Sequence, residues 1–89
     1  MILRLRNKAI RLGASDLDVS NRKHKKFVVT YNGKHIHFGD NRYEDYTIHK
    51  DKVRRERYRA RHKMIKMKNG TLAYKNKNTA SYWSYNILW

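Results

Sequence analysis

The chain has 89 residues, no cysteine, and 22 Lys and Arg against 7 Asp and Glu, which gives a net charge of +15. A chain of this length forms one small domain, and the lack of cysteine excludes disulfides and thiolate metal sites. Because a small domain with this charge repels itself, we expect an anionic partner: nucleic acid, an acidic protein, or a membrane surface contacted from outside.

Residues 1–21 are predicted to form a basic N-terminal extension, outside a domain that spans residues 22–89. Leu5, Ala9 and Leu12 fall at helical spacing, and Gly13 would end such a helix. Alternation of Met1, Leu3 and Leu5 suits a short strand equally well, so both alternatives stay open. The following stretch, SDLDVSNRKHKK, is predicted to be turn-rich.

The segment FVVTYNGKHIHF, residues 27–38, predicts a β-hairpin. Asn32-Gly33 suits a type I′ turn, which needs positive φ at both central residues. This turn pairs Tyr31 with Lys34 and Phe27 with Phe38, so that one face of the hairpin is apolar. An isolated hairpin is marginally stable in water, and the apolar face therefore needs a cover.

A long basic helix over residues 48–68 is the expected cover, with Thr47 as its N-cap and Asn69-Gly70 as its stop. One apolar stripe of this helix is predicted to pack on the hairpin; its members are Val53, Ala60, Met64 and Met67. Tyr58 and Ile65 lie on a different side. They either receive a second molecule or contact the C-terminal segment of the same chain.

The C-terminal stretch TLAYKNKNTASYWSYNILW is the most aromatic part of the chain. Thr79 is predicted to cap a short helix from about residue 80. So many large apolar side chains would be an aggregation hazard if exposed, so the segment docks either on the hairpin and helix or on another molecule. The residues predicted to dock on a partner are Tyr58, Ile65, Tyr82, Trp83 and Trp89.

The basic helix is the predicted binding site for nucleic acid or an acidic partner. Arginine outnumbers lysine there, which suits a bidentate grip on phosphates or carboxylates. The alternative is a helix whose charges are only solvated. The candidate binding residues are Arg54, Arg55, Arg57, Arg59, Arg61, Lys63 and Lys66.

Catalytic and metal sites have little support, and we expect no enzyme, no cofactor and no metal. His35 and His37 share one face of a strand, but no third ligand is set by local spacing. The acids around the start of the helix favour capping and loop polarity over a metal-dependent nuclease, which remains a distant third alternative. They are Asp40, Glu44, Asp45, Asp51 and Glu56. No phosphate-binding glycine motif occurs.

Several short motifs resemble an uncharacterised family of short basic proteins of nucleocytoplasmic large DNA viruses, including iridovirus, chlorella virus and mimivirus relatives. These motifs are Phe38-Gly39, Tyr43, Asp45-Tyr46-Thr47, His49-Lys50-Asp51, Arg54, Tyr58, Arg61-His62, Thr79-Ala80, Trp83-Ser84 and Leu88-Trp89. The resemblance covers residues 22–89. Ser81 stands where that family has Gly, and relatives often continue beyond the position of Trp89.

The resemblance implies a viral setting and brings no catalytic residues. We therefore expect a small α+β domain: the hairpin, the basic helix packed across it, and a docked aromatic C-terminal segment. The expected function is that of a structural virion protein, a minor capsid or cement component that contacts other virion proteins. The alternative is a virion protein that binds viral DNA or other nucleic acid without sequence preference. No small-molecule substrate is expected.

Overall fold

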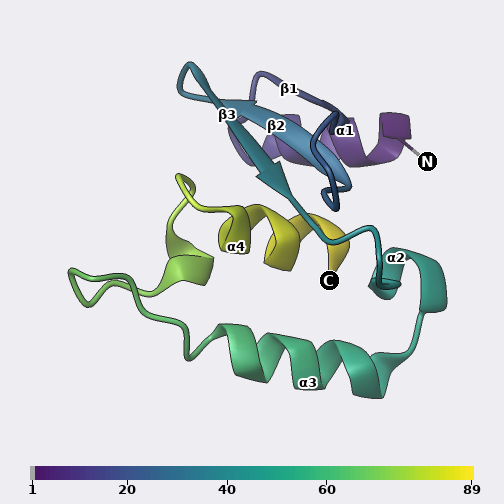
Figure 1. Cartoon of the computed structure of the whole chain (residues 1–89), viewed down its shortest axis with the longest axis vertical. Coiled ribbons are helices and arrows are strands. Elements are labelled where there is room, and N and C mark those ends of the chain that lie inside the picture. Colours follow the sequence, from purple (N-terminus) through teal and green to yellow (C-terminus); the bar gives the residue numbers. More distant parts are fainter. Residues whose placement is uncertain (1) are drawn as a thin grey trace.

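The computed structural model describes residues 2–89 and has an antiparallel sheet at one end of an α+β domain (Figure 1). Strands β1 (Asp16–Val19), β2 (Phe27–Tyr31) and β3 (Lys34–Phe38) pair in the order β1-β2-β3. Helix α1 (Ile2–Arg11) precedes the sheet. After it come α2 (Tyr46–His49), α3 (Lys52–His62), the 3₁₀ turn η1 (Ala73–Lys75), α4 (Ala80–Trp83) and the π-helical turn η2 (Ser84–Leu88). The α+β prediction is confirmed.

The β2–β3 hairpin has the predicted register. Tyr31 pairs with Lys34, and Phe27 pairs with Phe38. Asn32 and Gly33 have φ values of 52° and 74°, the two positive values that a type I′ turn requires. The core-facing row continues across the sheet, because Leu17 of β1 lies opposite Val29, which in turn lies opposite Ile36.

The N-terminal residues belong to the domain and are not an extension of it. Leu5 and Ala9 of α1 are buried in the main core, as are Ala14 and Leu17. The helical alternative for this segment is therefore correct, and Gly13, at φ 106°, follows the helix end. The turn prediction is wrong for Asp16–Val19, since these residues form β1. A boundary at residue 21 would separate β1 from β2, its hydrogen-bonded partner.

The C-terminal helical stretch, α4 with η2, lies between the sheet and α3 (Figure 1). Trp83, Ile87 and Leu88 are almost fully buried and pack with Phe38 and Val29 of the sheet. Thr79 caps α4 as predicted, because its side chain accepts a hydrogen bond from the Tyr82 amide. The predicted docking of the aromatic segment is thus confirmed, and it occurs within the chain.

The predicted single helix over residues 48–68 is wrong at both ends. Lys50 has φ 56°, which ends α2 after one turn. Asp51 then caps α3 by accepting hydrogen bonds from the amides of Val53 (3.0 Å) and Arg54 (3.2 Å). Asp45 caps α2, so the predicted capping by Thr47 is also wrong. α3 ends at His62.

Asn69-Gly70 forms the tip of a turn and is not a helix stop. The Met67 amide donates to the Thr71 carbonyl across 2.8 Å, and Lys66 forms a β-bridge with Leu72. Gly70 occupies the tip with φ 85°. The chain therefore reverses direction after α3 and returns toward α4.

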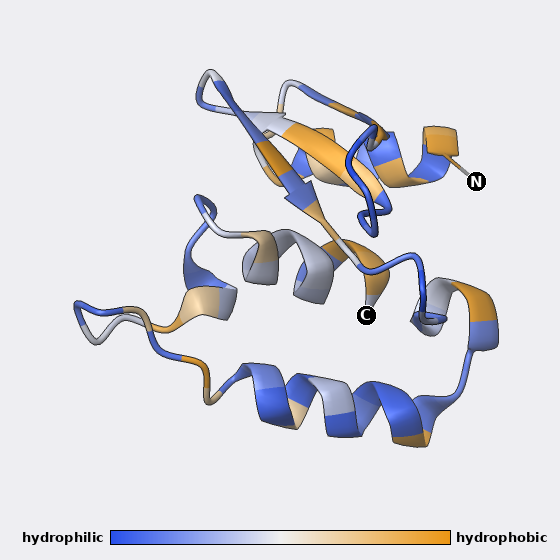
Figure 2. Ribbon diagram, in the orientation of Figure 1, coloured by the Kyte–Doolittle hydropathy of each residue, from blue (hydrophilic) through white to orange (hydrophobic). Residues whose placement is uncertain are grey.

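The predicted cover for the sheet is also different from the one observed. Val53 is 57% exposed, Met64 is 79% exposed and Ala60 is exposed as well, so these members of the predicted stripe face outward. Met67 lies beyond the end of α3 and is half-buried against Asn76. The physical reason is that α4 and η2 pack on the sheet, in the place where the long helix is predicted to pack. Figure 2 shows α3 as mostly hydrophilic, whereas much of β2 is hydrophobic. No helix of residues 2–89 is long and apolar enough to cross a bilayer.

Candidate nucleic-acid interface

The arginines of α3 divide into an outward and an inward group. Arg54, Arg57 and Arg61 are exposed and stand at spacing i, i+3 and i+7, which places them along one side of the helix. We call these three residues the arginine stripe. Arg55 and Arg59 are half-buried and face the C-terminal stretch.

The inward arginines attach α3 to the rest of the domain. The Arg55 Nε donates to the Trp89 carbonyl at 2.8 Å, and its guanidinium lies 4.9 Å from the centre of the Tyr46 ring. The Arg59 guanidinium lies 4.7 Å from the centre of the Tyr85 ring. These cation–π contacts occupy both side chains, so two of the predicted binding arginines have a structural role.

Tyr58 lies between the two inward arginines and is part of a three-ring stack. Its ring is 4.1 Å from Trp89 and 3.8 Å from His62, measured between ring centroids. The Tyr58 hydroxyl donates to the Ser84 Oγ at 3.1 Å. Burial raises the pKa of Tyr58. Of the two alternatives for Tyr58, contact with the C-terminal segment is therefore the correct one.

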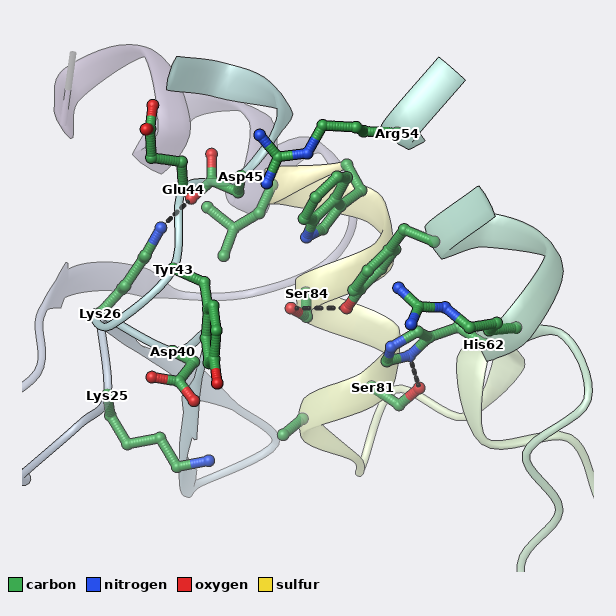
Figure 3. Close-up of a pocket in the computed structure, with 16 residues that line it drawn as sticks. Lys25, Lys26, Asp40, Tyr43, Glu44, Asp45, Arg54, His62, Ser81 and Ser84 are labelled. Atoms are coloured by element: carbon green, nitrogen blue, oxygen red, sulfur yellow. Dashed lines mark hydrogen bonds and ion pairs between the residues drawn. The ribbon is translucent and has the colours of Figure 1, made fainter. Parts of the chain in front are cut away.

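A cleft of about 630 Å³ separates α3 from the loop that follows β3 (Figure 3). The loop contributes Gly39, Asp40 and residues 43–45, and α3 contributes Arg54, Tyr58, Arg61 and His62. The C-terminal stretch contributes Ala80, Ser81, Ser84, Leu88 and Trp89. Lys25 and Lys26 line the same cleft from the segment before β2. Residues far apart in the sequence therefore line one cleft.

Most of the acidic side chains at this cleft are already paired. Lys26 Nζ and Asp45 Oδ2 lie 2.5 Å apart, and their side chains are only 11% and 4% exposed. Arg42 contacts Asp40 at 2.8 Å, and this hydrogen-bonded pairing holds the pKa of Asp40 well below its ordinary value. Lys25, Arg54 and Arg61 then face the cleft against the single carboxylate of Glu44, so its surface keeps a positive excess.

His62 is uncharged at neutral pH. Its pKa is lowered by burial and, to a smaller extent, by the positive charge of Arg61. The Nδ1 of His62 lies 3.4 Å from the Ser81 Oγ. The ring therefore adds a polar but neutral group to the wall of the cleft.

A second group of cations lies where α1 approaches the inward arginines. The pKa of Lys8 is lowered by burial first, and then by the nearby charges of Arg59, Arg55, Arg4 and Arg11. These cations repel one another. A bound polyanion would relieve part of this repulsion.

The other predicted site residues lie apart from the cleft. Lys63 caps the C-terminal end of α3, and Lys66 and the 45%-exposed Ile65 lie in the turn beyond it. Tyr82 packs edge-on against Trp83, at 5.0 Å. Trp83 is fully buried and donates from Nε1 to the Lys77 carbonyl at 2.7 Å, so its predicted role in docking on a partner does not fit this fold.

Lys25 and Tyr43 are among the cleft residues that the sequence did not predict as site residues. Both lie in connections between elements, where no periodic pattern marks which side chains face a common surface. The dense charge of NRKHKK was the available signal for Lys25. For Tyr43 the signal was a large aromatic side chain in an otherwise polar loop.

Comparison with known proteins identifies one family. The model of a family of unknown function, DUF5754, matches residues 15–62, a range that runs from just before β1 to the end of α3. No curated protein matches the chain, and no solved structure does. The matched range includes the whole sheet, the cleft loop and the arginine stripe, and it covers more than half of the 89 residues. The chain therefore belongs to the DUF5754 family.

Proposed function

We propose that this protein binds nucleic acid through its phosphate backbone and without sequence preference. The observation that carries the proposal is the arginine stripe: Arg54, Arg57 and Arg61 are exposed on one side of α3, beside a cleft with excess positive charge. Phosphates spaced along a strand suit guanidinium groups spaced along a helix.

The aromatic residues of the C-terminal segment pack within the chain, and this supports the same proposed function. Trp83 and Tyr85 are buried, and Trp89 is stacked on Tyr58. Docking of another protein on the aromatic C-terminal segment would require these contacts to open. The arginine stripe needs no such rearrangement to meet a polyanion.

The salt dependence of binding provides the test. Four phosphate contacts, from the arginine stripe and Lys25, give a slope of about −3.6 in log K against log salt on duplex DNA. Binding of a fluorescent random-sequence duplex would be followed by anisotropy across a salt series. Replacing Arg54, Arg57 and Arg61 with Gln should make this slope shallower by about 2 to 3.

A matched variant controls for net charge. Lys34, Lys68 and Lys75 are exposed and lie outside the cleft, so their replacement by Gln removes the same charge elsewhere. This triple variant should keep most of the affinity. Equal losses in the two triple variants would contradict a site on α3 and would leave only general attraction of a basic protein.

A structural role in a virus particle is the second candidate. It is supported by large apolar side chains on the outside of the domain, because Val53, Met64 and Ile65 are each at least 45% exposed. Another virion protein could cover them. Replacing Met64 and Ile65 with Ser would then prevent incorporation into purified particles, measured by mass spectrometry, while nucleic-acid binding stayed unchanged.

A further inference from the structure

We propose that the cleft takes one unpaired nucleotide, with its base stacked on Tyr43 and its phosphate held by Arg54 and Arg61, so that the protein prefers single strands to duplexes. This inference rests on the proposed function and specifies its ligand. It concerns a residue that the arginine stripe does not include.

Tyr43 is a large aromatic side chain left open to solvent. It is 68% exposed, whereas Tyr58 is packed between two other rings. In Figure 3 the Tyr43 side chain stands on the loop side of the cleft, across from Ser84 and His62. An exposed ring on the wall of a cationic cleft is the arrangement with which proteins stack bases of single strands.

The loop that carries Tyr43 is held in place before any ligand arrives. Arg42 bonds to Asp40 through two contacts, Nε to Oδ1 at 3.0 Å and Nη2 to Oδ2 at 2.8 Å. At the other end of the loop, Asp45 is held by the buried Lys26. The Asp45–Lys26 pair therefore anchors the loop two residues after Tyr43, and this anchor reduces the conformational entropy that stacking would cost.

The remaining walls suit a nucleotide in size and in chemistry. A cleft of about 630 Å³ lies within the range of ordinary small-molecule sites, roughly 300–1,000 Å³. The neutral ring of His62 and the Ser81 hydroxyl offer hydrogen bonds to a base edge without adding charge. Arg54, Arg61 and Lys25 line the same cleft and can reach the phosphate.

A duplex cannot use this cleft in the same way. Its bases remain paired and stacked between two phosphate strands, so the arginine stripe and Lys25 would contact its phosphates but Tyr43 would not reach a base. A single strand exposes its bases and can turn one of them into the cleft. Stacking then adds to the phosphate contacts and produces the preference.

The test uses the full chain and four probes: three single-stranded decamers with equal numbers of phosphates, and a ten-base-pair duplex. Fluorescent oligo(dT) and oligo(U) decamers represent DNA and RNA, and an abasic decamer keeps the phosphates but has no bases. Oligo(dT) should bind more tightly than the ten-base-pair duplex, and the affinity for oligo(U) relative to oligo(dT) shows whether the site favours RNA or DNA. Oligo(dT) should bind about tenfold more tightly than the abasic strand.

Two variants at one position isolate the ring. Tyr43→Leu should weaken oligo(dT) binding about tenfold and leave duplex binding within about twofold of the unchanged protein. Tyr43→Phe keeps the ring and should retain the single-strand affinity. Circular dichroism of both variants checks that the fold is intact.

The outcomes separate this inference from the proposed function. Equal binding of the abasic and oligo(dT) strands, or no effect of Tyr43→Leu, overturns the single-strand site while duplex binding still supports phosphate recognition. Equal weakening of duplex and single strand by Tyr43→Leu also overturns it. Failure to bind any probe at about 50 mM salt overturns both proposals.

Discussion

The ring of Tyr58 is nearly parallel to the indole of Trp89, with 7° between the planes and 4.1 Å between the centroids. His62 covers the opposite side of Tyr58 at 3.8 Å. Two stacked neighbours at such distances leave no room for a third ring or for a partner. This stack connects α3 to the C-terminal stretch.

Removing the central ring of the stack should strongly destabilise the fold. Tyr58→Ala deletes a buried aromatic ring and both stacking contacts, and should lower the free energy of unfolding by about 3 kcal/mol. Tyr58→Phe keeps the stack and loses the hydrogen bond to Ser84, at a cost of about 1 kcal/mol. Urea unfolding followed by tryptophan fluorescence measures both. Similar losses in the two variants would mean that the hydroxyl, and not the stack, holds α3.

Gly39 is a position where a methyl group has no space. A Cβ there would lie 2.8 Å from Leu88 Cδ1 and 3.1 Å from Lys26 Cβ, at φ +80°. Gly39→Ala should therefore combine backbone strain with overpacking and lower the free energy of unfolding by about 2–4 kcal/mol.

Gly70 provides the matched control for this substitution. Its φ is +85°, and nothing lies within 4 Å of a Cβ built there. Gly70→Ala should cost only the backbone strain, about 1 kcal/mol. Thermal unfolding of the two variants gives the comparison. If both lose the same stability, the close approach of Leu88 has no energetic consequence.

The negative charge of Asp45 should be needed for stability, because the side chain of Lys26 beside it is only 11% exposed. Asp45→Asn keeps an oxygen to cap α2 but leaves the Lys26 ammonium without a counter-charge, and should cost about 3 kcal/mol. The control is Asp40→Asn, whose partner Arg42 is 57% exposed and stays solvated. We expect a much smaller loss there. Denaturant unfolding of both variants measures the two losses. A larger loss of unfolding free energy in Asp40→Asn than in Asp45→Asn would contradict this prediction.

Acid should weaken the fold through His62. Its pKa in the folded protein is below the ordinary 6.5, so the unfolded chain binds a proton first as the pH falls. The stability from the neutral ring is complete above about pH 6.5 and is lost as the pH drops from there toward the lowered pKa. Unfolding free energies at about pH 7.5 and about pH 5 should differ less in His62→Gln than in the unchanged protein.

His37 serves as the comparison, since burial also lowers its pKa but its ring lies on the sheet and contacts Ser20. His37→Gln should leave the His62 contribution in place. A His62→Gln variant with the full pH dependence would assign the effect to other groups.

Local signals predicted the hairpin and the C-terminal cap well. Asn32-Gly33 determines the turn and hence the register. The Thr79 side chain accepts a hydrogen bond from the Tyr82 amide in the first turn of α4. Both depend on residues close together in the chain. β1 was missed because DLDV has only one buried side chain, Leu17, and its pairing with β2 is a long-range contact.

The division of the arginines could not be predicted, because it depends on where the C-terminal stretch packs. The helical spacing places Arg54, Arg57 and Arg61 together, but it does not say that the opposite side receives Trp89 and Tyr85. The outward orientation of Val53 and Met64 also depends on where the C-terminal stretch packs. Their apolar character predicts a buried stripe, whereas in the fold Tyr58 is the α3 residue that packs against Trp89 of the C-terminal stretch.

The middle position of α4 and η2 has a consequence for biosynthesis. A ribosome that has reached residue 78 has made the whole sheet and α3, but not the residues on which they pack. The sheet packs on Trp83, Ile87 and Leu88, and α3 contacts Ser84, Tyr85 and Trp89. The nascent chain would remain without a complete core until these side chains emerge, with α3 unable to settle against the sheet. Folding of this domain is therefore expected to follow the synthesis of its final helix and not to proceed element by element during translation.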